Sequence, residues 1–424
     1  MSEWLEPGLI NDVRAHLLDH PGPITASAVA TAVQRTGRVL GSAALLELVA
    51  RISAQLAGAG PLQPLLDEPG VTDVFVNGPR DIWVDRGAGL TRVRLSLGGE
   101  SDVRTLAVRL AALGGRRLDD STPLVDVQLP DGVRLNAVIP PLSGEHTIMS
   151  FRIPRPRGFT LAELIDTGAV PAAIAELLHQ ILTRRANFLI SGGTGSGKTA
   201  LLGALLAESA DDQRLVIVED SRELSLDHPH VVQLSARQSN VEGAGTVSLT
   251  DLVRNALRMR PDRLVVGECR GAEVRDMLTA LNTGHEGGCA TIHANTGEAV
   301  PARLEALGAL AGMTPAAVRS QVASAIDVVI HIRRLRTGEA TETGEATGSG
   351  AGARTGAGAG TGAGAGTGAG ASRQVSELSV PRAEPDGRIV MHPVWHAGTG
   401  FDATGLDMLT TLLAERSGII GPHR

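Results

Sequence analysis

The sequence predicts an α/β protein with a mainly parallel sheet in its C-terminal half and a smaller α+β domain before it. Residues 159–336 alternate helical and strand patterns, which is typical of a parallel sheet with helices on both faces. Residues 61–152 contain short strands around one helix, and residues 1–60 contain only helical patterns. We therefore expect a helical N-terminal segment, an α+β domain, a linker at 153–158 and an α/β domain.

The N-terminal segment has apolar residues spaced for one face of a helix, first at Val13 and Leu17 and again along 45–56. Pro21-Gly22-Pro23 separates the first helix from the second. A small helical cap packed on its neighbour is the simpler interpretation, and a docking module is the alternative.

The α+β domain is predicted from strands that turn signals divide, such as Asn77-Gly78-Pro79 and Asp131-Gly132. Apolar residues spaced along Asp102–Leu113 predict one helix. The predicted strands are Asp73–Asn77, Asp81–Asp85, Thr91–Leu95, Leu124–Leu129, Val133–Ile139 and Thr147–Arg152. This domain carries no catalytic constellation of its own.

The α/β domain contains a glycine-rich loop between a short apolar strand, Phe188–Ile190, and an apolar-periodic helix. The pattern Gly192-x4-Gly197-Lys198-Thr199 in this context predicts a phosphate-binding P-loop. Lys198 would neutralise the β- and γ-phosphates of ATP, and the Thr199 hydroxyl would bind Mg²⁺. The residues expected to contact the nucleotide are Gly192, Gly193, Thr194, Gly195, Ser196, Gly197, Lys198 and Thr199.

Acidic residues and a histidine follow three further apolar strands of this domain. Glu219 and Glu223 follow Leu215–Val218, Glu268 follows Leu264–Val266, and His293 follows Cys289–Ile292. Parallel strands bring their carboxyl ends to one edge of the sheet, where ligands bind. ATP hydrolysis requires a metal-holding acid and a group that orients water.

We assign Glu268 to Mg²⁺, directly or through water, and Glu223 to the attacking water, with Glu219 as the alternative for that role. His293 is a candidate sensor of the γ-phosphate. For His285, the alternative to a functional role is a structural one, in which the backbone satisfies its ring. A zinc site drawn from Cys289, His285 and His293 is discounted because the spacing fits no common ligand pattern.

Arginines near the nucleotide site have two interpretations. The linker stretch carries Arg152, Arg155 and Arg157, and we expect one of them, with Arg152 as the candidate, to reach phosphate; a solvated linker is the alternative. Arginines that either face a neighbouring subunit or form ordinary surface ion pairs are Arg254, Arg258, Arg260 and Arg270.

Residues 337–372 are mostly Gly, Ala and Thr, which predicts a flexible loop because such a stretch cannot bury a core. The flanking segments, Asp327–Arg334 and Arg373–Val380, are predicted to pair as a hairpin. Residues 373–424 are expected to complete the α/β domain with strands and a helix.

Composition limits the function. The net charge of −7, with no Tyr, five Phe and three Trp, predicts no direct nucleic-acid binding. Two cysteines favour a reducing compartment. The N-terminus lacks signal-peptide features and no 18-residue apolar run occurs, so we expect a cytoplasmic protein that reaches the membrane only through partners.

The motifs together resemble the secretion-superfamily traffic ATPases, which power type II and type IV secretion and type IV pili. They are most similar to the tight-adherence (Flp) pilus branch, TadA/CpaF. Gly192–Thr199 resembles the Walker A motif, Val218–Leu224 the Asp box, Leu257–Arg270 the Walker B stretch and Thr283–Asn295 the His box. The resemblance covers roughly residues 45–335 and includes Asp73–Gly78 and Arg134–Pro141 in the N-terminal domain.

This resemblance implies a RecA-like P-loop NTPase domain behind a PAS-like N-terminal domain, with Glu223 at the position of the family's catalytic base, the second Glu of the Asp box. It also implies a homohexamer that docks on an inner-membrane platform protein and hydrolyses ATP to drive pilus assembly, secretion or conjugation-like transfer. The 337–372 insertion is foreign to the family pattern. Rival interpretations are a RecA-like nucleic-acid translocase, a non-hydrolytic nucleotide-gated scaffold and, more weakly, a small-molecule kinase.

Overall fold

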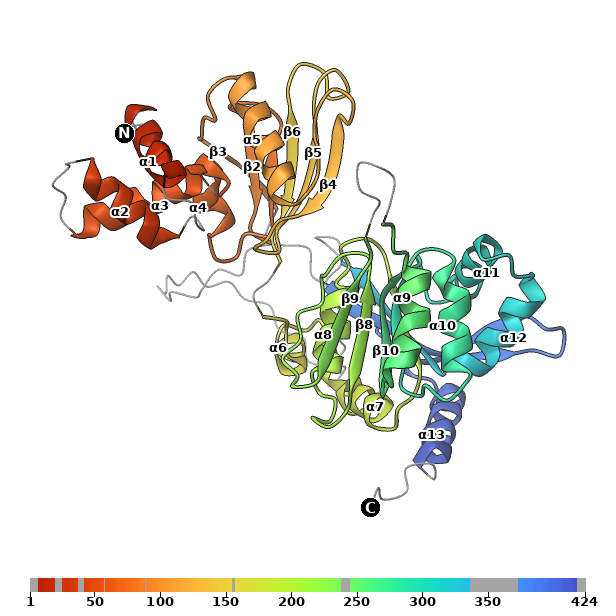
Figure 1. The fold of residues 1–424 in the computed structure, drawn as a ribbon. Coiled ribbons are helices and arrows are strands. Elements are labelled where there is room, and N and C mark those ends of the chain that lie inside the picture. The colour runs from red at the N-terminus through yellow and green to blue at the C-terminus, as the bar shows by residue number, and fades with distance from the viewer. Residues whose placement is uncertain are drawn as a thin grey trace, which may run out of the picture. The chain divides into compact units, whose positions relative to one another are not determined.

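The chain folds as two compact units, residues 1–154 and residues 155–424, and each has its own hydrophobic core. The computed structural model (Figure 1) describes residues 7–19, 25–36, 42–56, 58–87, 89–154, 157–237, 245–335 and 373–417.

The first unit begins with three helices that pack on one another. They are α1 (Pro7–Asp19), α2 (Ala26–Arg35) and α3 (Ser42–Leu56). Val13, Val29 and Ile52 are completely buried in their shared core. The helices predicted from the apolar spacing are therefore confirmed, while the predicted break at Pro21-Gly22-Pro23 lies outside the described residues.

The rest of the first unit is an antiparallel sheet of six strands in the order β3-β2-β1-β6-β5-β4, with α5 packed on it (Figure 1). Alternate residues along each inner strand are buried, such as Val74 and Val76, and they share a core with Val103 and Leu110 of α5. The elements are η1 (Gly60–Leu62), α4 (Gln63–Leu66), β1 (Asp73–Val76), β2 (Ile82–Asp85), β3 (Leu90–Val93), α5 (Glu100–Leu113), β4 (Leu124–Gln128), β5 (Arg134–Val138) and β6 (Ile148–Arg152). All the strands and the helix predicted here are confirmed.

The second unit is built on a nine-stranded sheet in the order β15-β14-β13-β12-β7-β11-β10-β8-β9. The strands from β12 to β9 are parallel, and β13, β14 and β15 continue the sheet in antiparallel pairing. The strands are β7 (Phe188–Gly192), β8 (Leu215–Glu219), β9 (Val231–Ser235), β10 (Arg263–Cys269), β11 (Cys289–His293), β12 (Val328–Arg334), β13 (Arg373–Ala383), β14 (Ile389–His396) and β15 (Gly400–Phe401). The prediction of a mainly parallel sheet is confirmed.

Helices cover both faces of this sheet because its central strands are apolar on both sides. On β7, Phe188 and Ile190 join the core under α6, α7, α8 and α13, whereas Leu189 joins the core under α9 to α12. The helices are α6 (Leu161–Asp166), α7 (Ala172–Thr183), α8 (Lys198–Leu206), α9 (Leu249–Ala256), η2 (Leu257–Met259), α10 (Glu273–Leu281), α11 (Val300–Leu310), α12 (Pro315–Ala325) and α13 (Ala403–Ser417). Among the described residues, no helix combines the length and apolarity needed to cross a membrane.

Two details of the second unit bear on the sequence predictions. The predicted hairpin is confirmed, since β12 pairs antiparallel with β13 and Arg334 lies opposite Arg373. The residues between these strands, including the predicted flexible loop, lie outside the described residues. Both acids were expected after their strands, but each lies within one. Glu219 pairs with Ser235 of β9, and β10 continues past Glu268 to Cys269, which pairs with Ile292 after a register shift that begins at Val266.

A buried polar network joins the last helix to the amino ends of β7 and β12. The Asp327 carboxylate accepts hydrogen bonds from the backbone N–H of Asn187 (2.7 Å) and from the guanidinium of Arg416 on α13 (2.6 Å). Arg416 also donates to the carbonyl oxygen of Arg185 at 3.1 Å. These side chains are nearly buried, so each charge depends on the other for compensation.

We expect Arg416→Ala to destabilise the second unit by about 3–5 kcal/mol, because it leaves the Asp327 carboxylate buried without its cation. Hydrogen exchange of the β7 and β12 amides, measured at increasing urea concentrations, gives the free energy of opening of this part of the sheet. Arg388→Ala is the matched control, since Arg388 pairs with Asp386 in solvent and its loss should leave the opening free energy nearly unchanged. Equal effects of the two substitutions would contradict the role given to the buried pair.

Candidate active site

The glycine-rich loop connects β7 to α8 and has the backbone shape that phosphate binding requires. Gly192 and Gly197 have φ angles of 157° and 100°, which residues with a side chain rarely adopt. A Cβ on Gly192 would also lie 2.3 Å from the carbonyl oxygen of Ile332. The eight residues predicted to bind phosphate lie in this loop and at the amino end of α8, which carries a partial positive charge.

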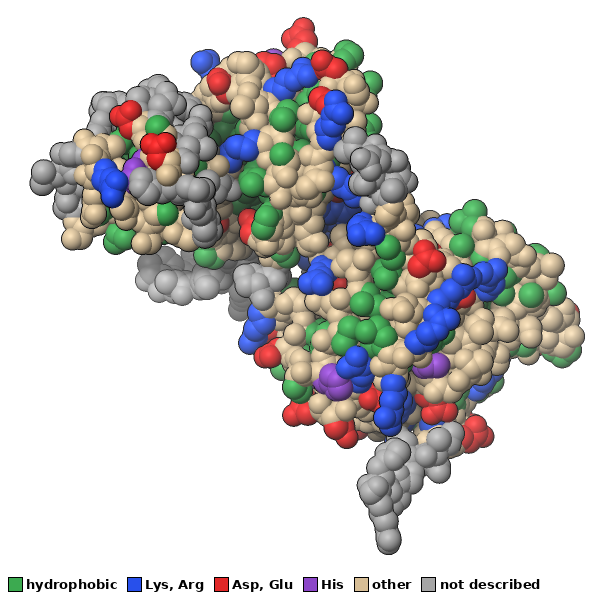
Figure 2. Space-filling model, in the orientation of Figure 1, with side chains coloured by type: hydrophobic (Ala, Val, Ile, Leu, Met, Phe, Trp, Pro, Cys, Tyr) green, Lys and Arg blue, Asp and Glu red, His purple; other side chains and the backbone are tan. Residues whose placement is uncertain are grey.

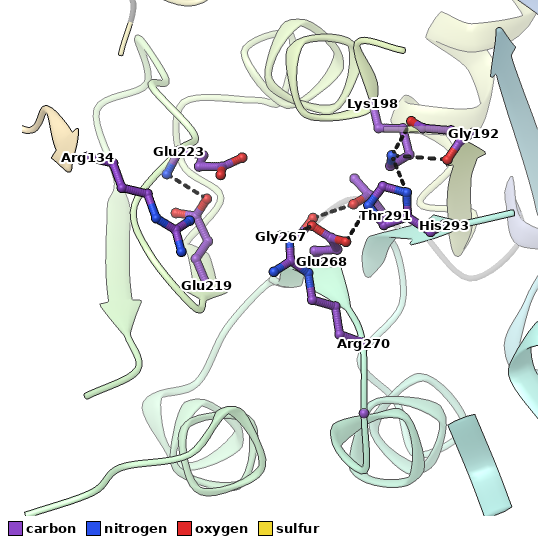
Figure 3. A network of polar contacts seen from close by, with 12 residues as sticks. Arg134, Gly192, Lys198, Glu219, Glu223, Gly267, Glu268, Arg270, Thr291 and His293 are labelled. Carbon is purple, nitrogen blue, oxygen red and sulfur yellow. Dashed lines mark hydrogen bonds and ion pairs between the residues drawn. The ribbon is translucent and has the colours of Figure 1, made fainter. Parts of the chain in front are cut away.

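The Lys198 side chain folds over this loop, and only 6% of the residue is exposed. Its ammonium donates hydrogen bonds to the carbonyl oxygens of Gly193 (2.8 Å) and Gly192 (3.1 Å) and lies 3.3 Å from Nδ1 of His293 (Figure 3). Burial lowers the pKa of Lys198, although the negative charge of Glu268 opposes this change. The cation is thus held by neutral acceptors, for which phosphate oxygens are stronger substitutes.

Glu268 and His293 project from the ends of the neighbouring strands β10 and β11 and contact each other. Oε1 of Glu268 lies 2.7 Å from Nε2 of His293, and Oε2 accepts a hydrogen bond of 2.5 Å from Arg270. Burial raises the pKa of Glu268, but the hydrogen bond and the charge of Arg270 outweigh it, so this pKa lies below its usual value. Burial and the Lys198 charge lower the pKa of His293. His293 therefore lies between the lysine and the carboxylate, within contact distance of both.

The two acids predicted at the end of β8 differ in burial. Glu219 is only 3% exposed, whereas Glu223 lies exposed in the loop that follows the strand. Oε1 of Glu219 accepts hydrogen bonds from the backbone N–H groups of Glu223 and Leu224, each at 3.0 Å. Burial raises the pKa of Glu219 to about 7. In Figure 3 the Glu223 carboxylate points from its loop toward the side on which Lys198 lies.

The groups at this sheet edge fit a nucleoside triphosphate with Mg²⁺. The Ser196 hydroxyl is buried, and no hydrogen-bond partner for it occurs among the described residues. Thr199 supplies a second hydroxyl from the first turn of α8, and Glu268 supplies carboxylate oxygens. Oxygen donors of these two kinds are the ones that Mg²⁺ prefers.

Arg152 and Arg157 each contact a carboxylate that does not belong to this cluster. Arg152, at the end of β6, belongs to the first unit, where its Nε lies 3.2 Å from a carboxylate oxygen of Asp73. Arg157 pairs with Glu163 at 2.6 Å, and Arg155 lies outside the described residues. A contact of Arg152 with nucleotide phosphate therefore stays a prediction.

His285 and Cys289 are placed by the backbone and the core. Nδ1 of His285 lies 3.3 Å from the carbonyl oxygen of Ala280, which matches the structural alternative. Cys289 is buried in β11, and burial raises the pKa of its thiol to about 12. Such a thiol is a poor source of the thiolate that zinc binds.

Basic side chains gather over α9 and α10 (Figure 2). Arg254 of α9 pairs with Asp276 of α10 at 2.8 Å, and Arg270 pairs with Glu268, so both have carboxylate partners within the chain. Arg258 and Arg260 are exposed, and in the described part of the chain no carboxylate pairs with either. These two keep their place as candidates to face a neighbouring subunit.

Two contacts of the P-loop region were not predicted. Nε of Arg373, the first residue of β13, donates a hydrogen bond of 2.9 Å to the carbonyl oxygen of Gly195. The buried pair Ser191 and His331 joins β7 to β12 through a distance of 2.9 Å between Oγ and Nδ1. The only sequence signal for His331 is a polar residue inside the apolar run of β12, and Arg373 has none.

Residues 55–398 match the family described as type II/IV secretion system protein, which is most of the chain. The chain belongs to this family. It is 46% identical over 376 residues to a putative conjugal transfer protein of Mycobacterium tuberculosis, covering 87% of this chain and 97% of the relative. It is 31% identical over 307 residues to the type IV secretion system protein PtlH of Bordetella pertussis, covering 66% of this chain and 89% of the relative.

A solved structure of a pilus motor has a fold similar to that of this secretion-family chain. The crystal structure of the pilus retraction motor PilT with bound ADP matches with a TM-score of 0.51 and 18% identity, over 85% of this chain and 88% of PilT. At this identity the match concerns the fold alone. The predicted fold class, a RecA-like domain preceded by an N-terminal domain, is confirmed.

We expect Arg373→Ala to weaken binding of a fluorescent ADP analogue about three- to tenfold, because it removes a charged donor that holds the P-loop carbonyl of Gly195. Fluorescence titration measures the dissociation constant. Arg388→Ala is the control. It removes an exposed arginine from the turn between β13 and β14 and should leave the dissociation constant unchanged. An unchanged affinity in Arg373→Ala would show that this contact does not support the loop.

Proposed function

We propose that this protein hydrolyses ATP to power protein secretion or pilus assembly, as the motor of a type II/IV-like system. The observation that carries the proposal is the continuous contact from the P-loop lysine through His293 to Glu268 at one edge of the sheet. A nucleotide-binding loop alone supports only binding. A strand-end acid joined to its lysine supports chemistry on the γ-phosphate.

The roles of the residues follow from their positions. The loop N–H groups and the amino end of α8 bind the phosphates, and the Lys198 ammonium exchanges its carbonyl partners for phosphate oxygens. Thr199 and Glu268 hold Mg²⁺, which neutralises phosphate charge when bound. Glu223, exposed beside this edge, orients the attacking water. His293 contacts both Lys198 and Glu268, so its contacts change when the γ-phosphate draws the lysine away from the glycine carbonyls.

The coupled process is inferred from the relatives. The mycobacterial relative covered almost end to end carries the name of a conjugal transfer protein, and PtlH is named as a type IV secretion system protein. We place the chain in the tight-adherence (Flp) pilus branch on its motif resemblance, as a homohexamer at the cytoplasmic face of an inner-membrane platform protein. The exposed Arg258 and Arg260 are suited to stabilise phosphate charge across the subunit interface of such a ring.

We expect Glu268→Gln to lower ATP turnover at least about 100-fold while nucleotide affinity stays within about threefold, because the acid acts on the reaction and Lys198 still grips the phosphates. Lys198→Ala should instead abolish tight nucleotide binding. Phosphate release and titration with a fluorescent nucleotide measure the two effects. Glu176→Gln, an exposed acid on α7, is the control.

Turnover of Glu268→Gln equal to that of the parent would remove the assigned role. A parent protein that binds ATP tightly without releasing phosphate would favour a nucleotide-gated scaffold. Turnover that rises on addition of DNA, with steep salt dependence, would favour a nucleic-acid translocase.

A homohexamer predicts a native mass of six chains in the presence of an ATP analogue, measured by native mass spectrometry. Arg258→Ala should retain that mass and lower turnover if the arginine acts across the interface. A monomer at micromolar concentration with full turnover would contradict the ring.

A further inference from the structure

Glu219 is a buried carboxyl group at the active edge of the sheet, and the mechanism above does not use it. It is the last residue of β8 and only 3% exposed. Its strand lies beside β10, which carries Glu268. Burying a carboxyl group costs free energy of folding unless hydrogen bonds replace those it made with water.

One oxygen of Glu219 organises the loop that carries Glu223. Oε1 accepts hydrogen bonds of 3.0 Å from two consecutive backbone N–H groups, those of Glu223 and Leu224. The loop belongs to no helix or strand, so these donors have no ladder partner. Two further contacts fix the same point: the Leu224 side chain is buried in the core, and its carbonyl accepts a hydrogen bond of 2.6 Å from Gln233.

The other carboxylate oxygen, Oε2, is buried. No hydrogen-bond donor for Oε2 occurs among the described residues. The side chain packs against Gly267, where an added Cβ would lie 2.6 Å from Cγ of Glu219. Gly267 directly precedes Glu268, so this packing sets the separation between the Glu223 loop and the second acid. Burial also raises the pKa of Glu219 to about 7, as expected for a group that favours its neutral form.

We propose that Glu219 is a positioning residue: it holds the Glu223 backbone through Oε1 and spaces that loop from Glu268 through Gly267, and it does not itself orient the attacking water. A water-orienting carboxylate needs a free oxygen at the water. Glu219 has one oxygen committed to two N–H donors, and the other is buried without a hydrogen-bond donor among the described residues. The inference rests on the proposed ATP hydrolysis and decides between the two acids that the sequence left open.

Replacement of the carboxyl group by an amide separates the two roles. Glu219→Gln keeps the size of the side chain and one oxygen that can accept both N–H groups, but it removes the acid. We expect kcat for ATP within about threefold of the parent in Glu219→Gln. Glu219→Ala should lose at least about tenfold in kcat with the dissociation constant for ADP within about twofold. Glu223→Gln should abolish turnover.

Glu219→Gln as inactive as Glu223→Gln would overturn the proposal, because the acid itself would then be required. Parental kcat in Glu219→Ala would also overturn it. Hydrogen exchange of the peptide spanning 220–226 is a second measurement that does not depend on turnover. Glu219→Gln should keep its protection and Glu219→Ala should lose it. A parent without ATPase activity but with this exchange pattern would refute the proposed function and leave the anchoring role intact, whereas unchanged exchange in Glu219→Ala would refute the anchor.

Discussion

The contact between the Lys198 ammonium and the carbonyl oxygens of Gly192 and Gly193 is the interaction on which the rest of the site depends. A cation in so buried a place requires acceptors close by, and the loop supplies them only because its glycines turn the backbone inward. The strand order then brings His293 to the lysine from β11 and Glu268 to His293 from β10. Under the proposed function, a phosphate that takes the lysine from its carbonyl partners would change the contacts of His293 and Glu268 on the next two strands.

The sequence predicts this arrangement well wherever the signal is local. Runs such as Phe188–Ile190 and Leu215–Val218 have no polar interruption, so they indicate buried parallel strands, and polar residues at their ends indicate the active edge. The helix expected at Asp102–Leu113 from its apolar spacing and the hairpin between β12 and β13 were also predicted from local patterns. The expected strands Leu215–Val218 and Leu264–Val266 are slightly shorter than β8 and β10, which include Glu219 and Glu268.

Contacts between distant parts of the chain were beyond prediction. Arg373 reaches Gly195 across 178 residues, and Arg416 reaches Asp327 from the last helix. Neither arginine differs in its local sequence from an exposed one. The same limit left Glu219 and Glu223 as alternatives, because burial, which separates them, follows from the strand pairing of β8 with β10 and from the glycine at position 267.

The central claim concerns where the lysine goes when nucleotide binds. A crystal structure of the protein with a non-hydrolysable ATP analogue and Mg²⁺ tests it most directly. The account predicts that Nζ of Lys198 leaves the two glycine carbonyls and lies within hydrogen-bond distance of β- and γ-phosphate oxygens, with Glu268 on the metal side. A nucleotide bound elsewhere, with Lys198 still on the carbonyls of Gly192 and Gly193, would contradict it.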